Sequence, residues 1–144
     1  MSNALDLKEF ADKYVTLWNE PDPEARGALV RDLWAPDAVQ VLTDPPQEMR
    51  EAAKALAFPA PPLEVRGHAA LDARVTRAYE MFIKAGEYAF VSGAEPYEPM
   101  AGVVCLRWKM RTTGTGEDVG GGFDVISLDA DGRIRSDHQF IEMS

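Results

Sequence analysis

Two residues near the end of the chain, Asp124 and His138, have side chains that could transfer protons together. They flank the segment Asp129-Ala130-Asp131-Gly132, which is typical of a tight hairpin turn with a left-handed glycine. If Asp129 pairs with Arg133, counting outward places Leu128 opposite Ile134, Ile126 opposite Ser136 and Asp124 opposite His138. This face is mainly apolar, so we expect the helices to cover it.

A carboxylate and an imidazole on a buried face allow two interpretations. In the first, His138 only satisfies the buried carboxyl group of Asp124 through a structural hydrogen bond. In the second, burial and mutual contact move both pKa values toward neutrality, and Asp124 and His138 act as a general acid and base. Both interpretations depend on the register of the hairpin, because a slip of one residue exchanges the two faces of a strand.

The first half of the chain has the apolar spacing of helices. Asp6 and Glu9 form a capping box for a helix over residues 6–19, and Asp22-Pro23-Glu24 begins a second helix that ends near residues 35–37. A short strand is expected over residues 39–42. Prolines bracket residues 43–62, which we interpret either as a lid containing a helix over 47–58 or as a plain surface excursion. A third main helix begins at Gly67-His68 and ends near Gly86.

After Gly86 the apolar pattern alternates, as in strands. The expected strands are Tyr88–Val91, Gly102–Arg111, Phe123–Asp129 and Arg133–Glu142. In the second of these, Trp108 is expected to face inward and Arg107 outward. Helices followed by a strand meander predict a single α+β domain over residues 1–144, with the helices on one face of an antiparallel sheet.

Composition excludes several classes of function. The chain has 144 residues and a net charge of -9, which disfavours binding to nucleic acid or to an anionic membrane. No signal peptide or membrane span is apparent, so we expect a cytoplasmic protein. One cysteine, Cys105, and two histidines give no spacing typical of a metal site, and no nucleotide-binding fingerprint is present. We therefore expect neither a metal nor a cofactor.

Four segments taken in order resemble the SnoaL-like branch of the nuclear transport factor 2-like superfamily. They are Tyr14–Trp18, Leu33–Val39, Arg66–His68 and Asp129–Ile134. The resemblance covers nearly the whole chain. It implies a cone-shaped α+β fold, with helices in the concave face of a curved sheet and a pocket between them, and it implies a homodimer packed through the outer sheet face.

Members of this superfamily include polyketide cyclases, isomerases, epoxide hydrolases and pocket proteins without assigned chemistry. In its enzymes an Asp or His on the inner sheet acts as acid or base, a role that Asp124 and His138 could take here. The sequence does not place a tyrosine beside a second, protonated carboxyl group, as the isomerases require. It also puts Arg107 on the wrong face for the Asp-Arg-Asp set of the hydrolases.

The remaining candidates are side chains that could line such a pocket and hold a hydrophobic ligand. They are Tyr14, Trp18, Trp34, His68, Tyr79, Trp108 and Phe140. The helix aromatics among them are equally compatible with a plain core, and His68 with a helix start. Two functions follow: a cofactor-free isomerase, cyclase or lyase acting on a hydrophobic cyclic molecule, or a non-catalytic ligand-binding or dimeric accessory protein. On the outer face, Val103, Cys105, Phe123 and Val125 are too apolar for solvent and suggest the dimer contact.

Overall fold

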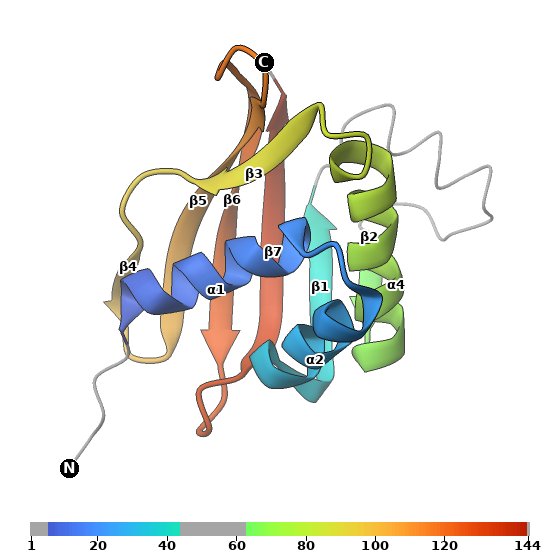
Figure 1. Ribbon diagram of the computed structural model, residues 1–144. Coiled ribbons are helices and arrows are strands. Elements are labelled where there is room, and N and C mark those ends of the chain that lie inside the picture. Colours follow the sequence, from blue (N-terminus) through green and yellow to red (C-terminus); the bar gives the residue numbers. More distant parts are fainter. Residues whose placement is uncertain (1–5, 44–62, 144) are drawn as a thin grey trace.

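The structure is a computed structural model that describes residues 6–43 and 63–143 (Figure 1). Within them the helices are α1 (Leu7–Asn19), α2 (Pro23–Leu33) and α4 (His68–Ala78), which continues into a π-helical turn, η1 (Tyr79–Ile83). The strands are β1 (Trp34–Thr43), β2 (Leu63–Arg66), β3 (Tyr88–Ser92), β4 (Tyr97–Met100), β5 (Val103–Thr112), β6 (Asp118–Leu128) and β7 (Ile134–Met143). The predicted helix over residues 47–58 lies outside the described residues.

Local sequence signals fix the starts of the helices. The Asp6 side chain accepts a hydrogen bond from the Glu9 amide at 3.0 Å, as predicted for the capping box. Asp22 caps α2 in the same way, and Pro23 occupies its first turn, where a missing N–H costs little. At the start of α4, Gly67 has a φ of 86°, a left-handed conformation that favours glycine.

The strands form one mixed sheet in the order β2-β1-β7-β6-β5-β3, and β4 pairs with β5. The prediction of an antiparallel sheet is wrong at one place, because β1 and β7 run parallel. A parallel neighbour needs no tight turn, and between β1 and β7 the chain passes through β2, α4, η1 and the strands β3 to β6. β1 is also longer than the predicted strand, since it begins directly after α2 at Trp34.

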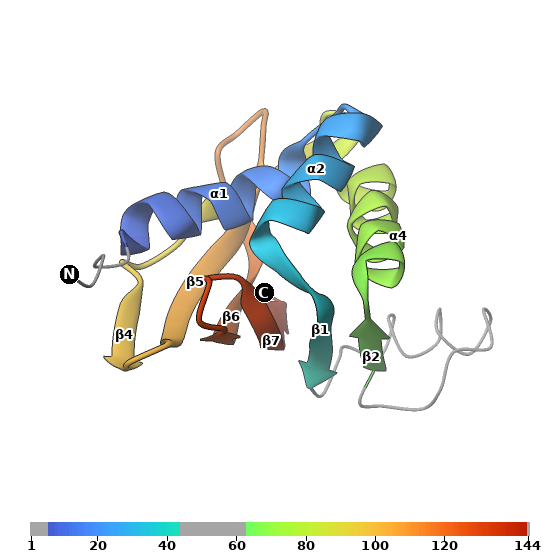
Figure 2. The ribbon, with the colours of Figure 1, turned by 90° about the horizontal axis from the view of Figure 1, so that it is seen from below.

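The sheet is curved, and the helices lie on its concave side (Figures 1 and 2). Helix α1 crosses this side and buries its apolar face there, while α2 and α4 pack beside it. The core between the two layers includes Leu17, Trp34, Val75 and Ile126, which are almost completely buried. The predicted α+β cone, with helices in the concave face of the sheet, is therefore confirmed.

The hairpin that joins β6 to β7 contains a β-bulge. Its turn forms as predicted: the Asp129 carboxylate accepts hydrogen bonds from two amides within the turn, and Gly132 has a φ of 81°. Leu128 pairs with Ile134 as expected, but Ser127 then pairs with Ser136, so Arg135 is an extra residue on β7. Beyond this point every predicted pair on β7 is displaced by one residue.

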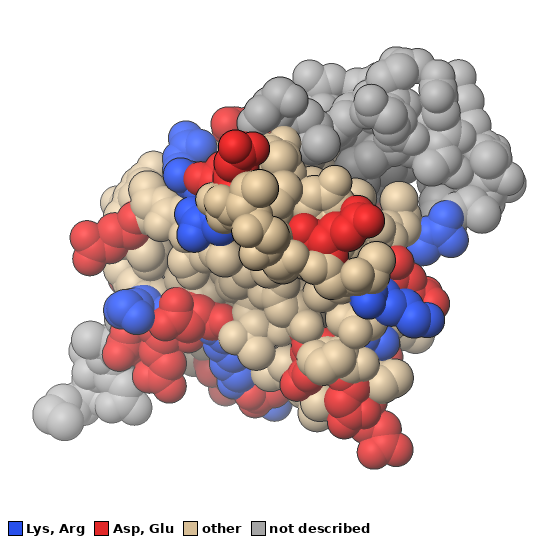
Figure 3. Space-filling view, turned by 45° about the horizontal axis from the view of Figure 1, so that its top comes forward, with Lys and Arg blue, Asp and Glu red and all other residues tan. Residues whose placement is uncertain are grey.

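Charged side chains show no concentration of one sign on the face seen in Figure 3. Lys and Arg lie among Asp and Glu, and the middle of this face is mostly uncharged. None of the helices in the described part of the chain is long and apolar enough to cross a membrane.

Candidate active site

Two carboxyl groups meet inside the molecule, on the concave face of the sheet. Asp124 on β6 and Asp137 on β7 are both fully buried, and Tyr14 of α1 reaches down to them. The Tyr14 hydroxyl oxygen lies 3.0 Å from Asp124 Oδ2 and 2.6 Å from Asp137 Oδ2. A helix side chain thus bridges two neighbouring strands. We call Asp124 and Asp137 the carboxyl pair.

The bridge requires a proton on one of the two carboxyl groups. A phenol has a single O–H hydrogen, so Tyr14 can donate to only one acid at a time. The shorter contact, to Asp137, is the stronger candidate for that donation. When Tyr14 donates to Asp137, a protonated Asp124 can in turn donate to the Tyr14 oxygen across the 3.0 Å contact. The three groups therefore form a chain that carries one acidic proton and one negative charge.

Burial favours the state in which Asp124 carries a proton. Loss of water around the carboxyl group raises the pKa of Asp124 well above its ordinary value, and the neighbouring charge of Asp137 raises it further. Burial also raises the pKa of Asp137, although hydrogen bonds from Tyr14 and Gln40 oppose this shift. Among the described residues no Lys, Arg or His forms an ion pair with either group. A buried acid whose pKa is raised in this way is suited to donate a proton.

Amide and indole groups supply the remaining hydrogen bonds of the carboxyl pair. Trp108 Nε1 donates to Asp124 Oδ1 at 2.8 Å, and Gln139 Nε2 donates to Asp124 Oδ2 at 3.2 Å. Gln40 Nε2 donates to Asp137 Oδ2 at 3.1 Å. These side chains lie on β5, β7 and β1, so four adjacent strands contribute to one polar cluster.

Trp108 reaches Asp124 because the facing strand has no side chain in its path. A Cβ atom on Gly122 would lie 2.4 Å from the Trp108 ring, far inside van der Waals contact. The glycine run at 120–122, which could be taken for a flexible strand entry, instead provides room for this indole. Trp108 faces inward and Arg107 is exposed on the other face, as predicted.

Arg74 of α4 adds a positive charge at the edge of the cluster. Its Nη2 donates to Gln139 Oε1 at 3.1 Å, and its guanidinium carbon lies 5.3 Å from the centre of the Trp18 ring. Because arginine only donates, this contact turns the amide oxygen of Gln139 toward α4 and its NH₂ group toward Asp124. Burial lowers the pKa of Arg74, and the nearby acidic groups act against that shift.

The predicted Asp124–His138 pair does not form. The bulge at Arg135 places Gln139 opposite Asp124 and puts His138 opposite Val125, where it is exposed on the outer face. Phe140 changes faces for the same reason: it lies beside Phe123 on the outside, with ring centres 6.2 Å apart. The register counted from the turn was wrong by one residue.

The other predicted pocket residues separate into two groups. Trp18 and Trp34 are buried beside Tyr14, with ring centres 6.1 and 6.4 Å from it. His68 and Tyr79 lie elsewhere, since His68 Nε2 is 2.7 Å from the Trp34 carbonyl oxygen and Tyr79 packs under the Arg26 guanidinium. The structure also provides a tyrosine beside two carboxyl groups, an arrangement that the sequence analysis did not place.

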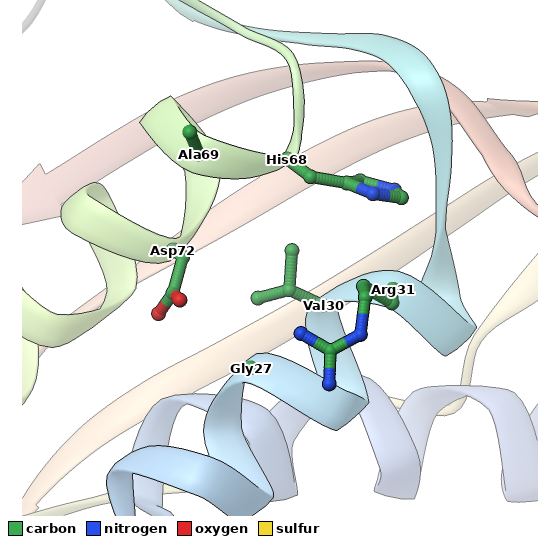
Figure 4. A pocket seen from close by; sticks show the side chains of 6 residues that line it. All are labelled: Gly27, Val30, Arg31, His68, Ala69 and Asp72. Atoms are coloured by element: carbon green, nitrogen blue, oxygen red, sulfur yellow. The ribbon is translucent and has the colours of Figure 1, made fainter.

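His68 borders a small surface cleft between α2 and α4 (Figure 4). The cleft has a volume of about 120 Å³ and is lined by Gly27, Val30, Arg31, His68, Ala69 and Asp72. None of these residues belongs to the cluster around the carboxyl pair. Within the described ranges, no group of three or more His, Cys, Asp or Glu side chains is arranged to hold a metal ion.

Solved structures of other proteins share the fold of this chain. No family model and no curated protein matches the chain. A proposed isomerase of the SnoaL-like family from Agrobacterium tumefaciens is similar at a TM-score of 0.72 and 26% identity, over 94% of this chain and 97% of that one.

Two further structures share the fold at lower identity. A SnoaL-like protein of unknown function from Burkholderia thailandensis has a TM-score of 0.65 and 14% identity, over 96% of this chain and 98% of that one. A proposed SnoaL-like polyketide cyclase from Jannaschia has a TM-score of 0.60 and 12% identity, over 98% of this chain and 91% of that one. With its curved sheet and the three helices of its described part, the chain has the fold of the nuclear transport factor 2-like superfamily and is similar to SnoaL-like proteins within it.

Proposed function

We propose that the protein is a cofactor-free enzyme in which the carboxyl pair and Tyr14 carry out acid–base chemistry on a hydrophobic cyclic molecule. The observation that carries this proposal is the bridge of one tyrosine between two buried carboxyl groups, which have no ion-pair partner among the described residues. Such an arrangement is costly for folding, and costly polar groups are concentrated at functional sites. The names of the SnoaL-like isomerase and cyclase that share the fold are in keeping with an isomerase, cyclase or lyase.

The proton chain suggests how such a reaction would run. The Asp137 carboxylate removes a proton from the carbon next to a ligand carbonyl, and a hydrogen bond from the Asp124 O–H stabilises the oxygen as it becomes negative. Return of the Asp137 proton to a different carbon restores the enzyme and completes an isomerisation. Trp18 and Trp108 offer flat apolar surfaces beside the acids, which suit a cyclic ligand.

Exchange of carbon-bound hydrogen tests this chemistry without knowledge of the natural substrate. Cyclohexanone in D₂O is expected to lose its α-proton NMR signals faster with the protein than without it. D124N and D137N are each expected to slow the catalysed exchange by about 100-fold or more, because each removes one proton-transfer group. Asp131→Asn, in the exposed hairpin turn, is the matched control. Undiminished exchange in both D124N and D137N would contradict the proposal.

One observation favours the second candidate, a non-catalytic binder of apolar ligands. Asp124 and Asp137 are both 0% exposed, so a ligand can reach them only if neighbouring side chains move. In that case the carboxyl pair would hold α1 on the sheet rather than react. Cyclohexanone binding that persists in D137N, together with no exchange by the unchanged protein, would support this role.

We also propose that the protein forms a homodimer through the outer face of the sheet. Phe140 is 37% exposed there beside the half-buried Phe123 and Val125. The oppositely charged side chains of Arg107 and Glu142 lie next to this apolar row, which allows a two-fold contact to pair them across the interface. Light scattering should give twice the mass of one chain, and F140D should shift the protein toward the monomer. A monomer at every concentration would rule this out.

A further inference from the structure

We infer that Arg74 binds a carboxylate group of the ligand, so that the substrates are small hydrophobic cyclic acids. This inference rests on the proposed function, because it assigns the ligand class of the same site. Arg74 lies close to the carboxyl pair, has unused hydrogen-bond donors and forms no ion pair with an acid among the described residues.

Arg74 lies one side chain away from the carboxyl pair. Its Nη2 donates to Gln139 Oε1, and the other end of the same amide donates to Asp124. A ligand group held by the guanidinium would therefore sit within the length of a small ring from the acidic proton of Asp124. Because the guanidinium also lies against the Trp18 ring, an aromatic surface continues directly beside the charge.

Most N–H groups of Arg74 have no acceptor in the described part of the structure and are available to a ligand. A guanidinium has five N–H hydrogens, and the structure gives Arg74 one side-chain acceptor, Gln139 Oε1. In the described part of the chain, its Nε atom is buried without a hydrogen-bond partner, and so is Nε1 of the adjacent Trp18. Two buried, unsatisfied N–H groups on side chains in contact are a cost that an acceptor on a ligand would remove.

Among the described residues Arg74 has no acidic partner, although the chain contains 24 Asp and Glu against 15 Lys and Arg. Some basic side chains of the described part pair with acids, such as Lys8 with Asp12 and Arg111 with Asp118, and others without such a pair, such as Arg77, are exposed to solvent. Arg74 forms no such pair among the described residues, although it is half-buried. Arginine is also the side chain whose planar geometry matches a carboxylate with two parallel hydrogen bonds.

The charge of the carboxyl pair limits how a ligand can bind. The proton chain retains one negative charge on the far side of Gln139, which repels a second anion. A ligand carboxylate must therefore bind the Arg74 N–H groups that do not contact Gln139, so that its ring can lie along Trp18 toward the acids. This orientation distinguishes a cyclic acid from a neutral ring of the same size, which would gain nothing from Arg74.

Sodium benzoate, with benzamide as its neutral counterpart, is the probe for this site. In NMR titrations, benzoate should shift the Nε–H signal of Arg74, and benzamide should leave it unchanged. R74M keeps the aliphatic stem but not the charge, and we expect it to bind benzoate about tenfold more weakly or worse. Arg77→Met, an exposed position on the same helix, should bind like the unchanged protein.

The outcomes separate this inference from the proposed function. Benzoate binding that depends on Arg74 supports the anion site even if cyclohexanone exchange is never catalysed. Catalysed exchange that D124N abolishes, together with benzoate binding that R74M does not weaken, overturns the anion site and leaves the acid–base chemistry intact. Equal binding of benzamide, or no shift at Arg74 at saturating benzoate, also overturns it.

Discussion

Replacement of Gly122 by alanine is expected to destabilise the protein and to break the hydrogen bond from Trp108 to Asp124. The new Cβ would lie 2.4 Å from Cζ2 of the Trp108 ring, so the indole must leave its place. Overpacking of this kind typically costs about 1–3 kcal/mol of unfolding free energy. Loss of the 2.8 Å hydrogen bond from Trp108 Nε1 leaves Asp124 with one donor fewer. Urea unfolding measures the cost.

A matched control and a second background make this result specific. Gly114→Ala adds the same methyl group where no atom lies within 4 Å, and it should change the unfolding free energy little. In a W108F background the clashing part of the indole is absent, so G122A should cost less than it does in the unchanged protein. Equal costs in both backgrounds would show that the indole is not what the alanine meets.

The second large effect concerns the dependence of stability on pH. The folded pKa of Asp124 is raised above its unfolded value, so the folded state holds its proton more tightly than the unfolded state. The resulting stabilisation is fully present below the unfolded pKa, about 4, and is lost as the pH rises through the folded pKa. D124N removes this titration. Relative to D124N, the unchanged protein should become less stable from about pH 4 toward neutrality.

The sign and the slope of this pH dependence can both be measured by urea unfolding of the unchanged protein and D124N. One proton can contribute at most about 1.4 kcal/mol per pH unit to the difference between the two unfolding free energies. Asp131→Asn, in the exposed turn and away from the carboxyl pair, is the control for the loss of one acidic side chain. A difference between unchanged protein and D124N that stays constant, or that grows in favour of the unchanged protein as pH rises, would mean that Asp124 is not held protonated.

The features that the sequence predicted correctly depend on neighbouring residues. The capping box at Asp6 and the proline start of α2 are formed within a few residues, and so is the hairpin turn at Asp129. The inward face of β5 was also predictable, because its alternation is uninterrupted between Val104 and Met110. The mixed sheet was not, since the parallel pairing of β1 with β7 joins segments almost a hundred residues apart.

The sequence predicts the inward position of Asp124 but not its neighbours in the candidate site. The alternation of β6 predicts an inward position for Asp124, and the structure confirms that it is buried, but the predicted partner His138 lies opposite Val125. The true neighbours, Gln139 and Asp137, are invisible without the bulge, because a single extra residue reverses the faces of a strand. One available signal was Gln40, a polar residue in an otherwise apolar stretch at a position that proves fully buried. Its role emerges only when β1 is placed beside β7.

The bulge at Arg135 has a consequence for where the length of the chain can vary. From Ser136 onward, β7 is held in register by β6 on one side and β1 on the other. A residue gained or lost at Arg135 would change only the bulge, and Asp137 would keep its orientation toward Tyr14. An insertion between Asp137 and Gln139 would instead turn one of them to the exterior and separate the acids from their donors. Homologous chains that share this chemistry should therefore differ in length before Ser136 and not after it.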